Sequence, residues 1–181
     1  MYAMGLLELN SVAAGALAGD SMLKAADTTL VAAQPCCPGK FIVMVRGEVA
    51  AVKSAIAAGE EAAQENLIDS LVIPSVHPDV FEGILGAGDI VETGAMGTVE
   101  TFSLASCIYA ADAAVKAASV KLMEIRLGRG LGGKSYFTLT GDVSAVSEAV
   151  RVSVSVPECE GMIAQKVVIP SPHPSIREAM M

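Results

Sequence analysis

The stretch GLLELNSVA at residues 5–13 decides the fold, because the chain contains the same pattern twice. It returns as GTVETFSLA at residues 97–105, with the glycine, the glutamate, the serine and the last alanine at the same spacing. Two more pairs of matching segments are DSMLKAA at 20–26 with DAAVKAA at 112–118, and VIPSVHP at 72–78 with VIPSPHP at 168–174. The offset of 92 to 96 positions is far longer than the roughly 20–50 residues of a solenoid repeat. We therefore interpret the pattern as a duplicated domain.

The duplication predicts two domains, at residues 1–88 and 95–181, joined by the glycine-containing segment 86–94. In both copies, apolar runs of strand length alternate with alanine-rich runs of helix length. In the first copy we expect strands at 3–9, 29–33, 40–46 and 71–73, with helices at 11–26, at 48–65 and after Pro78. In the second copy we expect strands at 96–102, 120–127, 134–141 and 166–170, with helices at 103–118, at 142–154 and from Pro174. This order predicts an α+β protein, layered like an α/β sandwich, made of two ferredoxin-like domains with four-stranded antiparallel sheets.

Composition argues against several classes of function. The net charge is −8 and no basic patch is present to pair with phosphates, so we expect no nucleic-acid partner. No segment approaches the roughly 18 uncharged apolar residues of a membrane span. The first apolar run lacks a basic segment before it and is interrupted by Glu8, which is not typical of a secretory signal. We therefore expect a cytosolic protein without a membrane partner.

The four cysteines are expected to stay reduced in the cytosol. Cys36 and Cys37 are adjacent in the segment PCCPG, residues 35–39, which we expect to be a loop that continues neither neighbouring strand. Cys107 falls in a predicted helix, where a small buried thiol is expected. Cys159 lies in PECEG, residues 157–161, a composition that predicts an inert thiol on a surface loop.

The sequence offers no constellation of catalytic residues, and we predict that the chain is not an enzyme. His77 and His173 occupy equivalent places in the two copies, which favours a structural role for both. Glu8 and Glu100 are also equivalent, and we expect them to form hydrogen bonds beside the sheet. The glycine-rich segment 128–134 does not have the spacing of a phosphate-binding P-loop and precedes a predicted strand, so we interpret it as a flexible loop.

Four motifs, in the same order in both copies, resemble the tandem-domain shell proteins of bacterial microcompartments. They are Gly-x-x-Glu, Asp-x-x-x-Lys-Ala-Ala, a Gly-Lys strand start and Ile-Pro-x-x-His. The segment CPGK at residues 37–40 is similar to the iron-sulfur-binding propanediol-utilisation subgroup. The resemblance covers essentially the whole chain. It implies a structural protein of the microcompartment shell, in which a homotrimer forms a flat pseudo-hexagonal tile and joins other shell proteins edge to edge.

The resemblance also implies a central pore, lined by the loop between the second and third strands of each domain. The loop residues are Cys36, Cys37, Pro38 and Gly39 in the first copy, and Gly128, Arg129, Gly130, Leu131, Gly132 and Gly133 in the second. In this subgroup one cysteine per chain, at the position of Cys37, binds a single iron-sulfur cluster of the 4Fe-4S type. The implied role is electron transfer across the shell, with a redox enzyme as partner.

One thiolate per chain is too few for a cluster that usually has four protein ligands. Three-fold symmetry supplies three thiolates and leaves one iron for another ligand. Neighbouring side chains of an extended loop point in opposite directions, so Cys36 is a possible second ligand that we expect to face away from Cys37. Arg129 would either add positive charge near the cluster or simply face solvent.

Lys24 and Lys116 each follow an aspartate by four positions, which predicts ion pairs on the helix surface. The resemblance implies a second role, in which both lysines, with His77 and His173, lie at the edge of the tile. Two other functions stay open. One is a shell tile in which Cys37 lines a metabolite pore without a cluster or binds another thiophilic ion. The other is a soluble ligand-binding regulatory protein.

Overall fold

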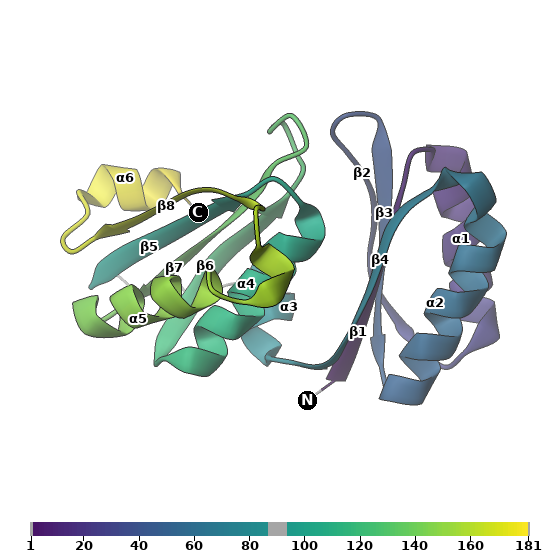
Figure 1. Cartoon of the computed structure of the whole chain (residues 1–181), viewed down its shortest axis with the longest axis horizontal. Coiled ribbons are helices and arrows are strands. Elements are labelled where there is room, and N and C mark those ends of the chain that lie inside the picture. The colour runs from purple at the N-terminus through teal and green to yellow at the C-terminus, as the bar shows by residue number, and fades with distance from the viewer. Residues whose placement is uncertain (1, 87–93, 181) are drawn as a thin grey trace. The chain divides into compact units, whose positions relative to one another are not determined.

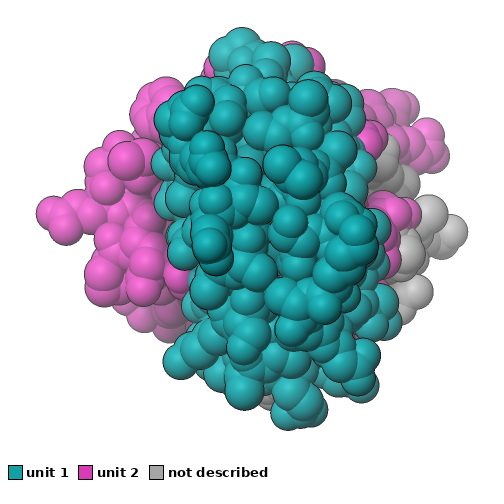
Figure 2. All heavy atoms as spheres, turned by 90° about the vertical axis from the view of Figure 1, so that its right-hand side faces the viewer, with its two compact units in different colours: residues 1–76 teal, residues 77–181 magenta. Residues whose placement is uncertain are grey.

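The computed structural model describes residues 2–86 and 94–180. Its contacts divide the chain into two compact units, residues 1–76 and 77–181, which Figure 2 colours teal and magenta. Each unit is built around one copy of the sequence repeat. Most of the glycine-containing segment that the sequence predicts as a linker, residues 87–93, lies outside the described residues.

The first unit is a four-stranded antiparallel sheet with the strand order β2-β3-β1-β4. Its elements are β1 (Tyr2–Leu9), α1 (Val12–Ala25), β2 (Thr29–Cys36), β3 (Lys40–Gly47), α2 (Val49–Ala63), the short 3-10 helix η1 (Gln64–Asn66) and β4 (Leu67–Val76). Figure 1 shows α1 and α2 side by side on one face of this sheet. The strand order is that of a ferredoxin-like domain, which confirms the fold class predicted for this copy.

The second unit repeats the arrangement with the strand order β6-β7-β5-β8. Its elements are α3 (Pro78–Leu85), β5 (Ala95–Thr101), α4 (Leu104–Ala117), β6 (Val120–Leu127), β7 (Ser135–Gly141), α5 (Val143–Ser153), η2 (Pro157–Cys159), β8 (Ile163–Ile169) and α6 (Pro174–Ala179). Helices α4 and α5 cover one face of the sheet, and α6 lies over the other face (Figure 1). The fold class predicted for the second copy is confirmed as well.

Two strands of the first unit are longer than the sequence predicts. Strand β2 continues through Pro35 to Cys36, and β4 covers Leu67–Val76. The prediction that the PCCPG segment could not continue a strand was wrong for its first two residues. The reason is the place of β2 at the edge of the sheet, where a proline that cannot donate a hydrogen bond is tolerated.

Helix α3 packs within the second unit, although the sequence assigns it to the first copy. Gly83 of α3 lies so close to β6 that a Cβ atom at this position would be 3.1 Å from Cγ1 of Ile125. The side chain of Lys121 on β6 also reaches Asp79 at 3.5 Å. By its contacts, the segment after Val76 therefore groups with the second sheet.

Each unit has a core between its sheet and its helices. In the first unit, small residues on helix α1 allow the helix to pack close to the sheet. Helix α1 buries Gly15, Ala18, Gly19 and Met22, which recur at the spacing of one helical face. A Cβ atom on Gly15 would lie 2.3 Å from Cδ1 of Phe41 on β3, so the phenyl ring fills the space that a larger helix residue would need. In the second copy Cys107 stands at the position of Gly15, and Ser135 stands at the position of Phe41. The larger helix residue there is matched by a smaller strand residue.

Candidate functional site

The β2–β3 hairpin carries the two adjacent cysteines. Cys36 is the last residue of β2 and pairs with Lys40, so the turn between the strands consists of Cys37, Pro38 and Gly39. Gly39 has a φ of 67°, a conformation that favours glycine, and the space around its α-carbon is open. The Cys37–Pro38 peptide bond is cis. The turn joins the ends of β2 and β3, where Figure 1 shows the hairpin projecting beyond the end of the sheet.

The two cysteines differ in access. Cys36 is 5% exposed, whereas Cys37 is half-buried beside the exposed residues Pro38 and Gly39. Burial and then the carboxylate of Glu8 raise the pKa of Cys36 to about 11, against a smaller lowering by Lys40. In the metal-free protein Cys36 is therefore a protonated thiol at neutral pH, and its burial limits its access to a metal. Of the two, Cys37 is the thiol that the hairpin presents to its surroundings.

An ion pair lies beside this turn and explains two motifs of the repeat. Nζ of Lys40 donates to Oε1 of Glu8 at 2.6 Å, and Nζ of Lys134 lies 2.6 Å from Oε1 of Glu100. The glutamate of Gly-x-x-Glu and the lysine of Gly-Lys thus meet across neighbouring strands in both units. This confirms the hydrogen-bonding role predicted for Glu8, and it shows Glu100 in an ion pair. The first pair is the more buried, with the Glu8 side chain 5% exposed and that of Glu100 29% exposed.

The equivalent loop of the second unit, residues 128–133, has no cysteine. All four of its glycines, at positions 128, 130, 132 and 133, have φ values between 62° and 93°, which explains the choice of glycine there. Arg129 is exposed and Leu131 is half-buried. The loop leads into strand β7 and not into a helix, so the prediction that it is not a P-loop is confirmed.

Both histidines begin a helix. Nδ1 of His77 accepts a hydrogen bond from the backbone N–H of Asp79 at 3.3 Å, and Nδ1 of His173 accepts one from Ser175 at the same distance. A proline follows each histidine as the first residue of the helix, a place that proline favours. The repeated Ile-Pro-x-x-His-Pro motif is therefore a helix start, in agreement with a structural role.

The two lysines form the ion pairs predicted by their spacing. Lys24 lies 2.5 Å from Asp20 on an exposed face of α1, and Lys116 pairs with the buried Asp112 on α4. The tile-edge role of Lys24, Lys116, His77 and His173 stays a prediction.

Cys107 and Cys159 are both buried. The interpretation of Cys159 as a surface-loop thiol was wrong, because η2 docks onto α4. Sγ of Cys159 donates to the carbonyl of Ser106 at 3.3 Å, and the Ser106 hydroxyl donates to the carbonyl of Glu158 at 2.8 Å. Burial, followed by the charge of Glu158, raises the pKa of Cys159 to about 11.

No cluster of three or more His, Cys, Asp or Glu side chains suited to a metal ion occurs within residues 2–86 and 94–180. A single copy of the chain thus contributes at most one accessible thiol from the hairpin turn. In the same described ranges, no helix is both long and apolar enough to cross a membrane.

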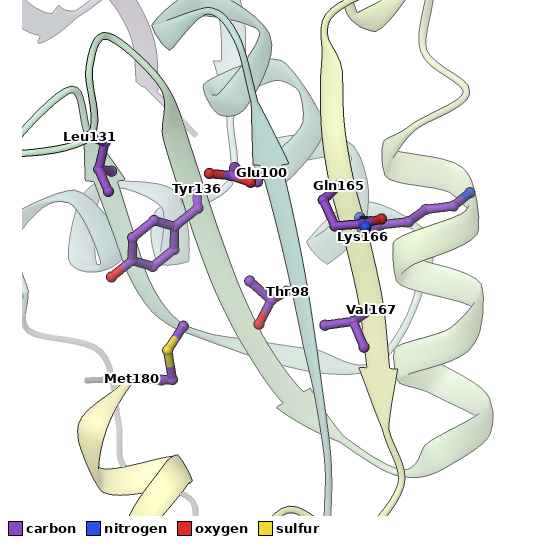
Figure 3. Close-up of a pocket in the computed structure, with 8 residues that line it drawn as sticks. All are labelled: Thr98, Glu100, Leu131, Tyr136, Gln165, Lys166, Val167 and Met180. Atoms are coloured by element: carbon purple, nitrogen blue, oxygen red, sulfur yellow. Dashed lines mark hydrogen bonds between the residues drawn. The ribbon is translucent and has the colours of Figure 1, made fainter.

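A cavity on the second sheet was not predicted from the sequence. It lies between the 128–133 loop and α6 and involves Thr98, Tyr136 and Met180 (Figure 3). A signal was present in the repeat, because Thr98 and Tyr136 stand where the first copy has Leu6 and Ile42.

The BMC domain family matches the chain twice, over residues 3–76 and 95–172. The chain belongs to the BMC domain family. Among BMC proteins, the bacterial microcompartment shell protein PduT of Citrobacter freundii is 45% identical over 179 residues, which cover 99% of this chain and 97% of the relative. The shell protein EutM of Salmonella typhimurium is 42% identical over 84 residues, which cover 45% of this chain and 88% of EutM.

A solved structure agrees with the fold of this BMC protein. The crystal structure of a microcompartments protein from Desulfitobacterium hafniense DCB has a TM-score of 0.94 and 48% sequence identity, and the match covers 98% of this chain and 99% of that one. This chain is thus a bacterial microcompartment shell protein with two BMC domains, as the resemblance of its motifs implies.

Proposed function

We propose that this shell protein forms a homotrimeric, pseudo-hexagonal tile whose central pore holds one 4Fe-4S cluster, bound by Cys37 of each copy. The observation that carries the proposal is the difference in access among the cysteines. Cys37 is half-buried on a projecting turn, whereas Cys36, Cys107 and Cys159 are buried. In a closed ring of copies, such a turn would bring one thiol per chain toward the symmetry axis.

The chemistry of the turn fits this group. Iron-sulfur clusters bind cysteine thiolates, and Cys37 supplies the sulfur. The space around Gly39 is open, so the backbone after the cysteine leaves room for a bulky inorganic group. Cys36 would hold the turn in place through its buried side chain and its pairing with Lys40. A bound cluster would supply one-electron transfer, and the tile would then conduct electrons across the shell.

The proposal assigns a structural role and no catalytic one to the rest of the chain. Both histidines cap helices, and the repeated glutamates are engaged by lysines. Other shell proteins would join the tile edge to edge near Lys24 and Lys116, and a redox enzyme would exchange electrons at the pore. Arg129, which is exposed on the second loop, would place positive charge near the pore.

The test is visible absorption and low-temperature EPR of anaerobically purified protein, before and after dithionite, with the oligomeric state measured by light scattering. The Cys37→Ser variant should lose the charge-transfer band and the reduced-state signal while it stays trimeric. The neighbouring Cys36→Ser variant is the matched control and should keep both signals. A colourless wild type, even after reconstitution with iron and sulfide, would overturn the cluster and leave a tile with an ordinary pore.

A further inference from the structure

Two large apolar side chains lie exposed next to each other where β5 ends and β8 is about to begin. The backbone N–H of Phe102 donates to the carbonyl of Met162 at 2.8 Å, so the two residues are neighbours on paired backbones. Phe102 is 58% exposed and Met162 is 41% exposed. A single exposed apolar side chain needs no explanation, but an adjoining aromatic and thioether pair is a candidate contact surface.

The first copy of the repeat has polar residues at the same two places. There the backbone N–H of Asn10 donates to the carbonyl of Asn66 at 3.0 Å, which is the same connection at the same strand ends. The fold therefore accepts asparagine at both positions and does not depend on Phe102 or Met162. The apolar pair thus distinguishes the second domain from the first.

The turn that leads to Met162 is fixed from inside the domain. It contains η2, and the backbone N–H of Met162 donates to the carbonyl of Cys159 at 3.0 Å. Sγ of Cys159 donates to the carbonyl of Ser106 at 3.3 Å, and the Ser106 hydroxyl donates to the carbonyl of Glu158 at 2.8 Å. Because the Cys159 side chain is buried, Glu158 and Glu160 on either side of it are left exposed. The surface is therefore preformed, with its charges turned outward.

The two carboxylates decide which kind of partner suits the apolar pair. Glu158 and Glu160 precede Met162 by four and two positions. Neither forms an ion pair within the part of the chain that the structure describes. A second copy of the chain, with the same carboxylates and a net charge of −8, would be repelled at this surface. A partner with basic side chains beside an apolar face would gain from both features.

We propose that the η2 surface, formed by Phe102, Glu158, Glu160 and Met162, binds a short amphipathic helix of another protein. Apolar side chains at positions i and i+4 of a helix lie about 5–6 Å apart, close to the roughly 5 Å between neighbouring side chains on paired strands. Two of them would therefore pack against Phe102 and Met162. Lysine or arginine beside them would pair with the two glutamates. The surface goes beyond the proposed cluster and does not depend on it.

The probe is a fluorescein-labelled helical peptide of about 14 residues, with leucines along one face and lysines beside them. A second peptide has glutamates in place of the lysines, and a third has the residues of the first in scrambled order. Binding to the intact oligomer is measured by fluorescence anisotropy at low and at high salt. A photo-reactive form of the first peptide, followed by mass spectrometry, shows where it binds.

The apolar pair is tested with the residues that the first copy has. In Phe102→Asn and Met162→Asn the side chains become those of Asn10 and Asn66, so both variants should fold. Circular dichroism and light scattering check the fold and the oligomeric state. We expect each variant to weaken binding of the lysine peptide by tenfold or more, the usual effect of losing an apolar anchor. The photo-reactive peptide should attach at Phe102 or within residues 157–162.

The charges are tested with two double variants. Glu158→Gln with Glu160→Gln should weaken binding and remove most of its salt dependence. Glu61→Gln with Glu65→Gln removes two exposed charges from the first unit and should change little. The absence of saturable binding, equal binding of the three peptides, or unchanged binding by folded Phe102→Asn would each overturn the proposal. So would association of the oligomers with one another that Phe102→Asn abolishes, because the occupant would then be a second copy.

Discussion

The backbone N–H of His77 donates a hydrogen bond of 2.8 Å to Oδ1 of Asp112. This contact ties the start of α3 to helix α4, and the Asp112 carboxylate also pairs with Lys116. Asp112 is 6% exposed. Its counterpart in the first copy, Asp20, has a 54% exposed side chain that pairs with Lys24. The same repeated aspartate is therefore a buried acceptor in one domain and a surface group in the other.

We expect Asp112→Ala to lower the free energy of unfolding by about 2 kcal/mol, because it leaves a partly buried N–H without its acceptor. Asp20→Ala should cost less than about 0.5 kcal/mol, the usual weight of an exposed helix ion pair. Urea denaturation followed by circular dichroism, at one protein concentration, measures both. Equal losses in the two variants would show that the contact to His77 contributes little.

Gly15 and Gly19 on α1 give a second matched pair. Gly15→Ala places a methyl group 2.3 Å from Cδ1 of Phe41, and we expect a net loss of about 1–2 kcal/mol from overpacking. Gly19→Ala meets only the methyl groups of Val43, at 3.4 Å, so the better helix propensity of alanine should leave it neutral or more stable by up to about 1 kcal/mol. The same denaturation assay compares them, and Phe41→Leu should partly rescue Gly15→Ala. Similar effects of the two alanines would contradict this description of the core.

The sequence repeat was sufficient to predict the fold, because local signals and periodicity agreed in both copies. Ser11 and Ser103 stand at the start of the first helix of each unit, and each side chain accepts a hydrogen bond from a backbone N–H three residues on. The central strands β1 and β3 are continuous apolar runs of strand length in the sequence, at residues 3–7 and 41–45, and are buried almost throughout. The access of Cys37 was also predictable, since a Pro-Gly pair after it indicates a turn.

Three features depend on contacts between distant segments and could not be read from local sequence. The packing of α3 against β6 requires Asp79 to meet Lys121. The burial of Cys159 requires η2 to dock on Ser106 of α4. The cavity forms because α6 lies over the open face of the second sheet. In the sequence, its one signal is that Thr98 stands where the first copy has Leu6, which is visible only when the two copies are compared.

The repeated Glu-Lys pairs should contribute unequally to stability. In Lys40→Met the carboxylate of Glu8, whose side chain is 5% exposed, loses its partner. Because Lys40 is itself partly exposed, we expect a cost of about 2 kcal/mol, below that of a fully buried pair. Lys134→Met should cost about 0–1 kcal/mol, since Glu100 reaches solvent. The double variant Glu8→Gln with Lys40→Met should recover part of the loss, and a larger loss for Lys134→Met would contradict the difference in burial.

The four cysteines should differ in their reaction with iodoacetamide, measured by peptide mass spectrometry on cluster-free protein. At pH 8 we expect modification of Cys37, while Cys36, Cys107 and Cys159 stay protected by burial. The raised pKa of Cys36, about 11, leaves roughly one thiolate in a thousand at pH 8, so its alkylation rate should rise about tenfold per pH unit and level off only above pH 11. The matched variant Cys36→Ser should leave the rate at Cys37 unchanged. If Cys36 instead reacts as fast as Cys37 at pH 8, the hairpin opens in solution, and Cys36 becomes a candidate ligand in its own right.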